Sequence, residues 1–261
     1  MLRGLWTAAT GMVSQQLTID VCANNLANAS TTGFKKSRSN FQDLMYQTIQ
    51  MPGATTASGG QVPVGIQAGM GSKATSAQKI YTQGDYEETG NDLDFAIEGK
   101  GFFKVLHGDE ELYTRAGNFT RDSEGYLCTA SGDRLQPEIA LPETTTSISL
   151  QADGTLTVFG GTDGAELTST NIMLYSFMNP AGLYSVGGNL LRATQASGEA
   201  VEGTPGSEGY GTVSNKNLEM SNVSVVEEMV AMIAGQRAYE ATSKALQTAD
   251  NMLQTANNVK R

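Results

Sequence analysis

Apolar residues recur every seven positions near both ends of the chain, but not in its middle. The row near the start is Leu5, Met12, Ile19 and Leu26, and the row near the end is Val225, Met232, Tyr239, Leu246 and Leu253. Seven-residue recurrence is typical of a helix that packs along a partner helix. The pattern therefore predicts long helices at both termini, over residues 2–28 and from Ser224 to the end, paired in one coiled-coil hairpin.

The boundaries of these helices have their own signals. The cluster from Asn28 to Gly33 competes with helical backbone bonding and supplies a glycine for a turn, so it ends the first helix. Ser224 followed by Glu227 has the spacing of a capping box and starts the second. A shorter stripe formed by Phe41, Leu44, Met45, Thr48 and Ile49 shares one face if it is helical. Pro52-Gly53 would end it.

The middle of the chain has the pattern of short strands separated by turns. Gly99-Lys100-Gly101 is interpreted as a turn or bulge, and Asp153-Gly154 as the turn of a compact hairpin. We expect an α+β multidomain fold, with an all-β domain inserted between the paired terminal helices. The expected parts are a helical core domain (1–45 with 222–261), extended connecting segments (46–72 with 200–221) and a β-rich outer domain (73–199).

Composition narrows the possible partners. The formal net charge is -10 and charged residues make up 17% of the chain, which argues against nucleic acid as a partner. The one basic run, Lys35, Lys36 and Arg38, is short and is interpreted as a solvated face. No apolar run approaches the ~20 residues needed to cross a bilayer. The amino terminus lacks the pattern of a cleavable signal peptide.

The sequence predicts no catalytic residue, cofactor or metal site. The single histidine, His107, lies in a polar stretch and is interpreted as a surface residue, because no zinc spacing links it to Cys22 or Cys128. Two groups of acidic residues would suit glycosidic chemistry if paired, but they are interpreted as turn caps and exposed side chains. These are Asp92, Asp94 and Glu98, and the pair Glu110-Glu111.

The helical rows also contain small and polar residues. These are Ala9, Gln16, Ala23, Gln236, Ser243 and Asp250. A weak, partly polar seam suits helices that pack against several neighbouring copies, which then supply additional burial. An ordinary hairpin within one chain fits the periodicity equally well, so the pattern alone does not choose between them.

The segment from Val21 to Lys35, VCANNLANASTTGFK, resembles the motif of the bacterial flagellar axial proteins, which form rods, hooks and hook-associated structures. Its motif residues are Ala23, Asn24, Asn25, Leu26, Asn28, Gly33 and Phe34. The segments Leu93–Phe103 and Tyr113–Phe119 resemble the start of the family's β domain, and Ser221–Glu240 resembles its C-terminal helix. Together these segments span nearly the whole chain in the family's order.

Within that family, two segments are most similar to the distal-rod branch. They are Leu2–Met12, and Asp43–Ile49 with its continuation through Pro52-Gly53 to Gly71. The proximal-rod and hook paralogues are the alternatives. A secreted cell-wall hydrolase that uses the β body is the alternative from another class.

The resemblance implies a structural role without enzymatic activity. Subunits would assemble helically into a hollow drive shaft in the basal body, crossing the cell envelope and transmitting torque from motor to hook. Terminal helices would line the channel, with the β domain outside. The implied partners are further copies, proximal-rod and hook subunits, bushing rings if the host has an outer membrane, and the type III export apparatus. Phe41 with Met45 is the candidate for the family's export element, and the alternative is that both are core residues.

The segment from Tyr46 to Gly71 is too poor in apolar residues to form its own core, yet it is long for a connection. We expect it to lie between neighbouring subunits and stiffen the rod. Pro52, Gly53, Val62, Val64 and Ile66 are its key residues, the last three forming an alternating anchoring face. A flexible tether is the alternative.

Overall fold

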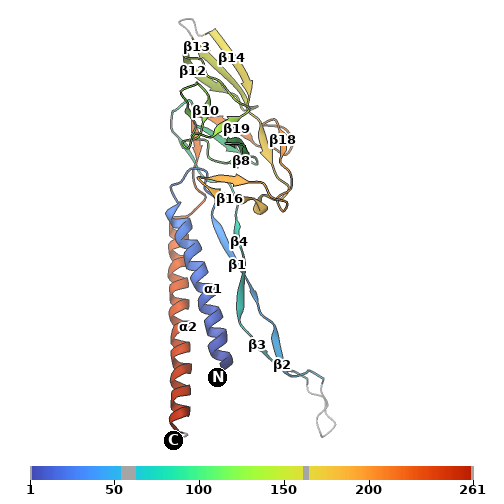
Figure 1. Ribbon diagram of the computed structural model, residues 1–261, viewed down its shortest axis with the longest axis vertical. Coiled ribbons are helices and arrows are strands. Elements are labelled where there is room, and N and C mark those ends of the chain that lie inside the picture. Colours follow the sequence, from blue (N-terminus) through green and yellow to red (C-terminus); the bar gives the residue numbers. More distant parts are fainter. Residues whose placement is uncertain (1, 54–62, 161–164, 260–261) are drawn as a thin grey trace. The chain divides into compact units, whose positions relative to one another are not determined.

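The computed structural model describes residues 2–53, 63–160 and 165–259 (Figure 1). The chain divides into two compact units. The terminal unit comprises Met1–Leu26, Ser37–Gln78 and Ser224–Arg261, and the β unit comprises Ala27–Lys36 and Lys79–Val223. The three-part division that the sequence suggests stays a prediction.

Two long helices and four strands make up the terminal unit. The helices are α1 (Leu2–Ala27) and α2 (Val225–Val259), and the strands are β1 (Ser37–Asp43), β2 (Tyr46–Gln50), β3 (Ile66–Gly69) and β4 (Ser72–Lys79). β1 pairs with β4, and β2 pairs antiparallel with β3. At the start of α2, the Glu227 amide lies 3.5 Å from the Ser224 hydroxyl. The expected order of helix, β-rich middle and helix is confirmed.

The two helices touch at three levels. Asn25 donates to Glu228 (3.2 Å), and a Cβ on Gly235 would lie 3.2 Å from Ile19 Cγ1. A Cβ on Gly11 would lie 3.7 Å from the methyl group of Thr242. Because the contact position on α2 rises as the position on α1 falls, the helices run antiparallel. The contact positions on α2 recur every seven residues.

The helical stripe expected at Phe41–Ile49 is wrong, because this region forms β1 and β2. The side chain of Asn25 binds both the N–H and the C=O of Ser37, each at 2.9 Å, and holds the chain extended where β1 begins. β1 then pairs with β4, a segment distant in sequence. A pairing with a distant segment leaves no trace in local periodicity.

The β unit contains the remaining strands and one short 3-10 helix, Pro180–Gly182. Seven strands form one antiparallel sheet in the order β16-β17-β8-β7-β11-β10-β9. They are β7 (Phe103–His107), β8 (Glu110–Thr114), β9 (Thr120–Arg121), β10 (Leu127–Cys128), β11 (Arg134–Gln136), β16 (Tyr184–Gly187) and β17 (Leu190–Arg192).

A three-stranded sheet and three strand pairs complete this unit. The sheet has the order β12-β13-β14, and the pairs are β15-β18, β19-β6 and β20-β5. Their bounds are β5 (Tyr86–Glu88), β6 (Phe95–Glu98), β12 (Thr145–Leu150), β13 (Thr155–Gly160), β14 (Ala165–Asn171), β15 (Leu174–Ser176), β18 (Val201–Gly203), β19 (Thr212–Asn215) and β20 (Asn217–Glu219). Asp153-Gly154 joins β12 to β13, so this predicted hairpin is confirmed.

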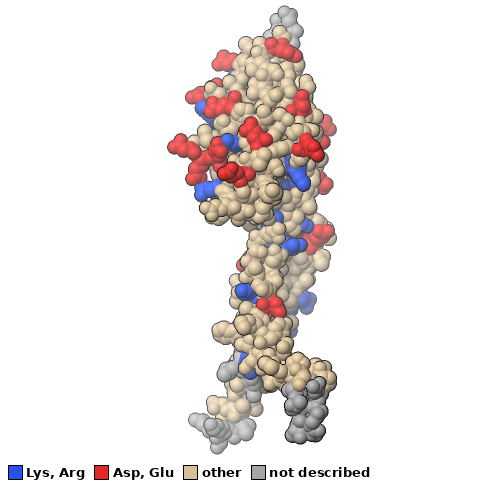
Figure 2. All heavy atoms as spheres, turned by 90° about the vertical axis from the view of Figure 1, so that its right-hand side faces the viewer, with Lys and Arg blue, Asp and Glu red and all other residues tan. Residues whose placement is uncertain are grey.

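The hydrophobic core lies in the β unit. Phe95, Phe103 and Phe119 are fully buried at its centre, and Phe119 contacts both of the other rings. A second cluster includes Phe102, Tyr113 and Phe177. Outside this core, Asp and Glu side chains gather on the surface of the β unit, whereas the visible face of the terminal unit is mostly uncharged (Figure 2).

Candidate assembly interface

The terminal unit has almost no hydrophobic core of its own. Among its described residues, Cys22 is the only apolar side chain that is buried; the other buried side chains are those of Ser14, Asn25 and Glu228. The predicted seam residues are covered only partly. Leu5, Met12, Ile19, Leu26, Met232, Leu246 and Leu253 are half-buried, and Val225 and Tyr239 are exposed. The helices therefore bring the predicted seam together without enclosing it.

The polar positions expected in the seam are mostly elsewhere. Gln16, Ala23, Gln236 and Asp250 are exposed. The positions of α2 that contact α1 between its apolar seam residues are Glu228, Gly235 and Thr242. Small residues at two of these positions allow a close approach of the helices, which a seam of larger side chains would prevent.

Asn25 is the buried centre of the Asn-rich motif. Its amide joins three elements of the terminal unit, because it binds the Ser37 backbone on β1 and donates to Glu228 on α2. Burial and the neighbouring Glu228 carboxylate raise the pKa of the Cys22 thiol one turn earlier. An asparagine here satisfies three polar partners at once, which explains why the motif needs an amide at this position.

The rest of the motif forms the turn that leaves α1. Gly33 has a φ of +68°, and a Cβ there would lie 2.5 Å from the backbone nitrogen of Ala116. Phe34 is buried, while Ala23 and Asn24 are exposed. Asn28 accepts a hydrogen bond from Thr31 (3.2 Å). The glycine is thus required both by its left-handed backbone and by a close contact.

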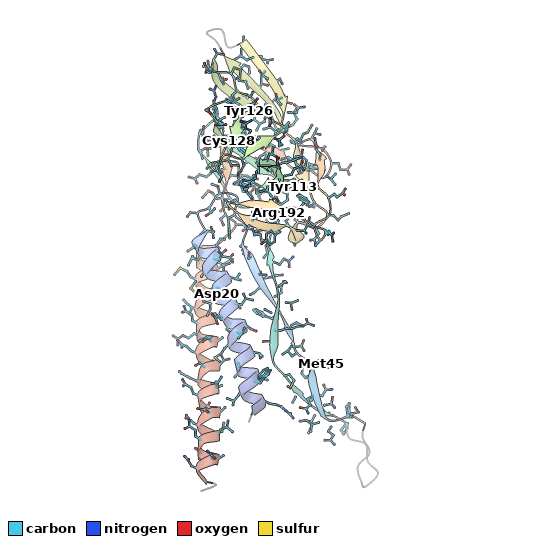
Figure 3. All side chains as sticks on the ribbon, in the orientation of Figure 1. Asp20, Met45, Tyr113, Tyr126, Cys128 and Arg192 are labelled. Carbon is cyan, nitrogen blue, oxygen red and sulfur yellow. The ribbon has the colours of Figure 1, made fainter. Side chains whose placement is uncertain are left out.

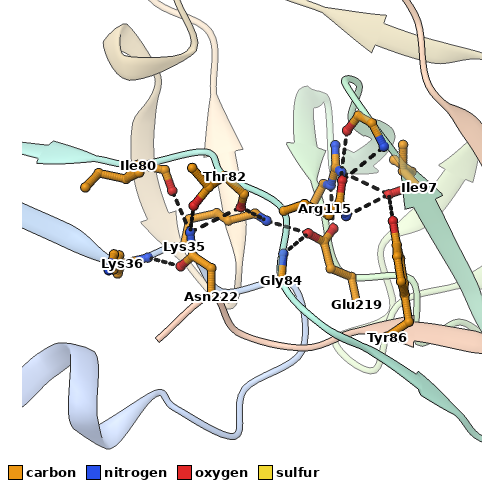
Figure 4. A network of polar contacts seen from close by, with 12 residues as sticks. Lys35, Lys36, Ile80, Thr82, Gly84, Tyr86, Ile97, Arg115, Glu219 and Asn222 are labelled. Atoms are coloured by element: carbon orange, nitrogen blue, oxygen red, sulfur yellow. Dashed lines mark hydrogen bonds and ion pairs between the residues drawn. The ribbon is translucent and has the colours of Figure 1, made fainter. Parts of the chain in front are cut away.

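A buried ionic network follows the motif within the β unit (Figure 4). One carboxylate, Glu219, pairs with Lys35 at 2.5 Å and with Arg115 at 2.6 Å. The Glu219 side chain has no solvent exposure. Arg115 also donates to the backbone carbonyls of Ile97 (2.9 Å), Gly99 and Gly101 (both 2.6 Å). Every member of the network has several hydrogen bonds, as buried charges require.

The interpretation of Lys35 as part of a solvated basic face is therefore wrong. Its amine donates to Glu219 and to the carbonyl of Thr82, and burial lowers its pKa although Glu219 opposes this shift. Sequence reasoning missed the network because Lys35, Arg115 and Glu219 lie far apart along the chain. The available signal was that all three lie in or beside the segments that resemble the family.

The remaining candidates from the sequence are His107 and the acidic residues around Asp92. His107 is exposed but pairs with the buried carboxylate of Asp133 at 2.5 Å. Asp92 pairs with Lys216 at 3.0 Å, and Asp94 is buried rather than exposed. Within the described residues, no cluster of His, Cys, Asp and Glu is arranged to hold a metal ion. In the same part of the chain, neither helix is long and apolar enough to cross a membrane.

The residues predicted for export and stiffening lie on the surface. Met45, labelled in Figure 3, lies in the short link between β1 and β2 and is 86% exposed, and Phe41 on β1 is also exposed. Pro52, Gly53, Val64 and Ile66 are exposed as well, whereas Val62 lies outside the described residues. Apolar side chains left in solvent on two-stranded ribbons are typical of a surface that a partner covers.

A β unit with its own core, joined to a helical unit without one, indicates a structural protein that assembles with others. Three family models match the chain. They are described as flagella basal body rod protein (residues 5–35), flagellar hook protein FlgE/F/G D1 domain (96–158) and flagellar basal body rod FlgEFG protein C-terminal (214–259).

Curated relatives agree with these matches. The flagellar basal-body rod protein FlgG of Borreliella burgdorferi is 47% identical over 100% of both chains. The FlgG proteins of Bacillus subtilis (37%, 100% of both chains) and Caulobacter vibrioides (42%, 92% of both chains) are also similar. The Borreliella hook protein FlgE is 41% identical, but over 52% of this chain and 31% of its own length.

The chain belongs to the flagellar basal-body rod protein family. FlgG is the subunit of the distal rod, so the predicted function as a distal-rod subunit is confirmed, and the hook and proximal-rod alternatives are not favoured. The family consists of structural proteins of the flagellum that assemble with one another and with neighbouring rod and hook subunits.

Proposed function

We propose that copies of this chain stack helically into a hollow shaft that transmits torque from motor to hook and lets export substrates pass. The observation that carries the proposal is the terminal unit, whose long helices leave apolar side chains in solvent. Burial of apolar surface is the main driving force of association. Neighbouring copies provide this burial, so the unit reaches its final packing only in the polymer.

In this proposal the antiparallel helices form a coiled-coil hairpin that lines the channel. The half-buried seam from Leu5 to Leu26 and from Met232 to Leu253 is completed by adjacent copies. α1 carries one acidic residue, Asp20, and one basic residue, Arg3. A wall with few charges attracts unfolded export substrates only weakly.

The partners follow from the position of a distal rod. Proximal-rod subunits lie below it, hook subunits lie above it, and bushing rings surround it in hosts with an outer membrane. Export uses the type III apparatus, and the exposed pair Phe41 and Met45 serves as the export element. The subunit catalyses no reaction, since its relatives are structural proteins.

The strands β2 and β3 give the rod its stiffness. An isolated two-stranded hairpin is only marginally stable in water, yet this one exposes Tyr46, Ile49 and Ile66, and Val64 just before β3 is exposed as well. Neighbouring copies cover these side chains and prevent subunits from sliding past one another. Deletion of Ala54 to Gln67 should leave assembly intact but give rods that bend like hooks, as seen by electron microscopy. Straight rods from the deletion strain would exclude the stiffening role.

Electron microscopy of the concentrated, purified chain tests the proposal directly. We expect straight hollow rods above a threshold concentration, with monomers below it. Analytical ultracentrifugation across the same range measures the association state, and near-ultraviolet circular dichroism provides the control, because the β unit should stay folded in both states. A chain that stays monomeric at every concentration, under conditions in which the β unit is folded, would contradict the proposal.

A further inference from the structure

An apolar groove lies between α1 and β4 in the terminal unit. It has a volume of about 340 Å³ and is lined by Trp6, Ala9, Thr10, Val13, Ser14, Ser72, Lys73 and Ala74. Two contacts set its width. The Ser14 and Ser72 hydroxyls are 3.1 Å apart, and Gly71 lies so close to Thr10 that no Cβ would fit between them. The groove is therefore fixed by hydrogen bonding and backbone approach.

The walls of this groove are unusually exposed for apolar side chains. Trp6 is 64% exposed and Val13 is 67% exposed. Trp6 is also the only tryptophan in the chain. A tryptophan half in solvent beside a formed apolar groove is typical of a surface that accepts a partner side chain.

A matching ridge lies on α2. Val226, Met229, Val230 and Ile233 are each at least half exposed. Their spacing places them on one face of the helix. The positions that contact α1, Glu228 and Gly235, lie on another face, so no helix covers the ridge among the described residues of the terminal unit.

The groove and the ridge agree in length and in charge. Trp6 to Val13 and Val226 to Ile233 each span seven residue steps, roughly 10 Å of helix. Lys73 is the only charged side chain among the described lining residues of the groove, and the ridge residues carry no charge. Joining them buries apolar surface with little desolvation of charge.

The ridge of a chain cannot reach the groove of the same chain. Glu228 contacts Asn25 and Gly235 contacts Ile19, which places the ridge beside the end of α1, roughly 20 Å along the helix from the groove. A contact between them must therefore join two copies. Such a contact uses different surfaces on the two partners, and contacts of this kind propagate into helical filaments.

We propose that the ridge Val226–Ile233 of one copy fills the Trp6–Val13 groove of a neighbouring copy. This contact rests on the proposed assembly into a rod and names the surfaces that carry it. Each copy offers one ridge and one groove, so the contact repeats along the polymer without a second kind of subunit.

Fluorescence of Trp6 in the unmodified chain tests whether the groove is filled. In the monomer we expect an emission typical of exposed tryptophan and strong quenching by acrylamide. In sedimented rods the emission should shift to shorter wavelength, and quenching should fall several-fold. Rods whose Trp6 is quenched as strongly as in the monomer would overturn the proposed contact alone. A chain that forms no rods would overturn the proposed function as well.

Cross-linking identifies the occupant of the groove. Rods from an equal mixture of the Val13→Cys and Val230→Cys variants should give covalent dimers on mild oxidation, because the two native cysteines are buried. Rods assembled from either variant alone should give few covalent dimers. Leu167→Cys, an exposed apolar position of the β unit, replaces Val230→Cys in the matched control. Dimers with Met45→Cys or Leu167→Cys but not with Val230→Cys would show that another segment fills the groove and would refute the assignment.

Discussion

The two units of this chain differ in where their apolar side chains lie. In the β unit, Phe95, Ile97, Phe103 and Leu112 are shielded completely from solvent. In the terminal unit, Trp6, Val13, Val226 and Val230 are largely exposed. The first unit can gain its stability within one chain, whereas the second has apolar surface left over. The difference separates the part that folds alone from the part that folds on assembly.

The polar residues of the two units differ in the same way. The β unit buries a full ionic network around Glu219, which is tolerated because each charge is paired and hydrogen-bonded. The terminal unit buries a neutral amide, Asn25, and one carboxylate, Glu228. Glu219 of the β unit and Asn25 of the terminal unit thus find their polar partners within the monomer. What the terminal unit lacks is hydrophobic coverage.

The largest effect is expected from a charge in the helical seam. Ile19→Asp places a carboxylate on α1 against Gly235. Leu246→Asp places one in the seam further along α2. Burying an unpaired charge costs several kcal/mol, so assembly should be lost while the β unit stays folded. Sedimentation measures the first result and near-ultraviolet circular dichroism the second. Motile cells that carry either variant would show that assembly does not depend on the helical seam, and would contradict the difference drawn between the two units.

Removing a buried charge from the β unit should instead destabilise the β unit itself. Glu219→Gln leaves Lys35 and Arg115 buried without a counter-charge, which typically costs about 3–5 kcal/mol. Denaturant unfolding of the monomeric Ile19→Asp background measures this loss without interference from assembly. Glu110→Gln is the matched control, because Glu110 and its partner Arg192 are both exposed and an exposed pair contributes less than about 1 kcal/mol. Equal losses in both variants would contradict the role of the network.

The helices could be predicted from the sequence because their information is local. Seven-residue recurrence locates the first helix to within one residue of its observed end at Ala27, and Ser224 marks the start of the second. The contact row of Glu228, Gly235 and Thr242 was missed, because two small residues and a carboxylate do not resemble an apolar seam. Their role depends on how closely α1 approaches.

Strand β1 and the ionic network could not be predicted from the sequence, because both depend on pairings between distant segments. β1 is a strand since Asn25 holds Ser37 and β4 lies beside it. Lys35 looked like a surface cation because its partner Glu219 lies near the other end of the chain. Resemblance to the family marked the correct residues, but it did not show what each of them touches.

A smaller effect should follow from closing the gap between the helices. Gly235→Val puts a branched side chain where a Cβ already lies 3.2 Å from Ile19. Overpacking of this kind costs about 1–3 kcal/mol, so the concentration threshold for rod formation should rise. Gly4→Ala is the control, since a Cβ there meets no atom within 4 Å and alanine favours the helix by up to about 1 kcal/mol. An unchanged threshold for Gly235→Val would show that the helices separate in the rod.

The smallest effect at neutral pH concerns Tyr81 of the β unit. Its ring packs edge-to-face against Phe102 at 5.5 Å, and among the described atoms its buried hydroxyl has no hydrogen-bond partner. Burial raises the pKa of this hydroxyl from about 10 to about 12. Because the folded chain keeps a proton that the unfolded chain releases, stability is intact below pH 10 and falls as the pH rises toward 12.

Tyr81→Phe removes this alkaline loss and leaves the ring contact in place. At pH 7 we expect a change within about 1 kcal/mol. Between pH 10 and 12 the variant should become more stable than the parent by up to about 2–3 kcal/mol. The lowered pKa of Lys35 acts in the opposite direction, but it is common to both chains and cancels in the difference. Urea unfolding of the β unit at pH 7, 9 and 11 measures this difference, with the exposed Tyr184→Phe as control. A pH-independent difference would mean that the Tyr81 hydroxyl is hydrated in solution, and that the β unit is less tightly closed than its core implies.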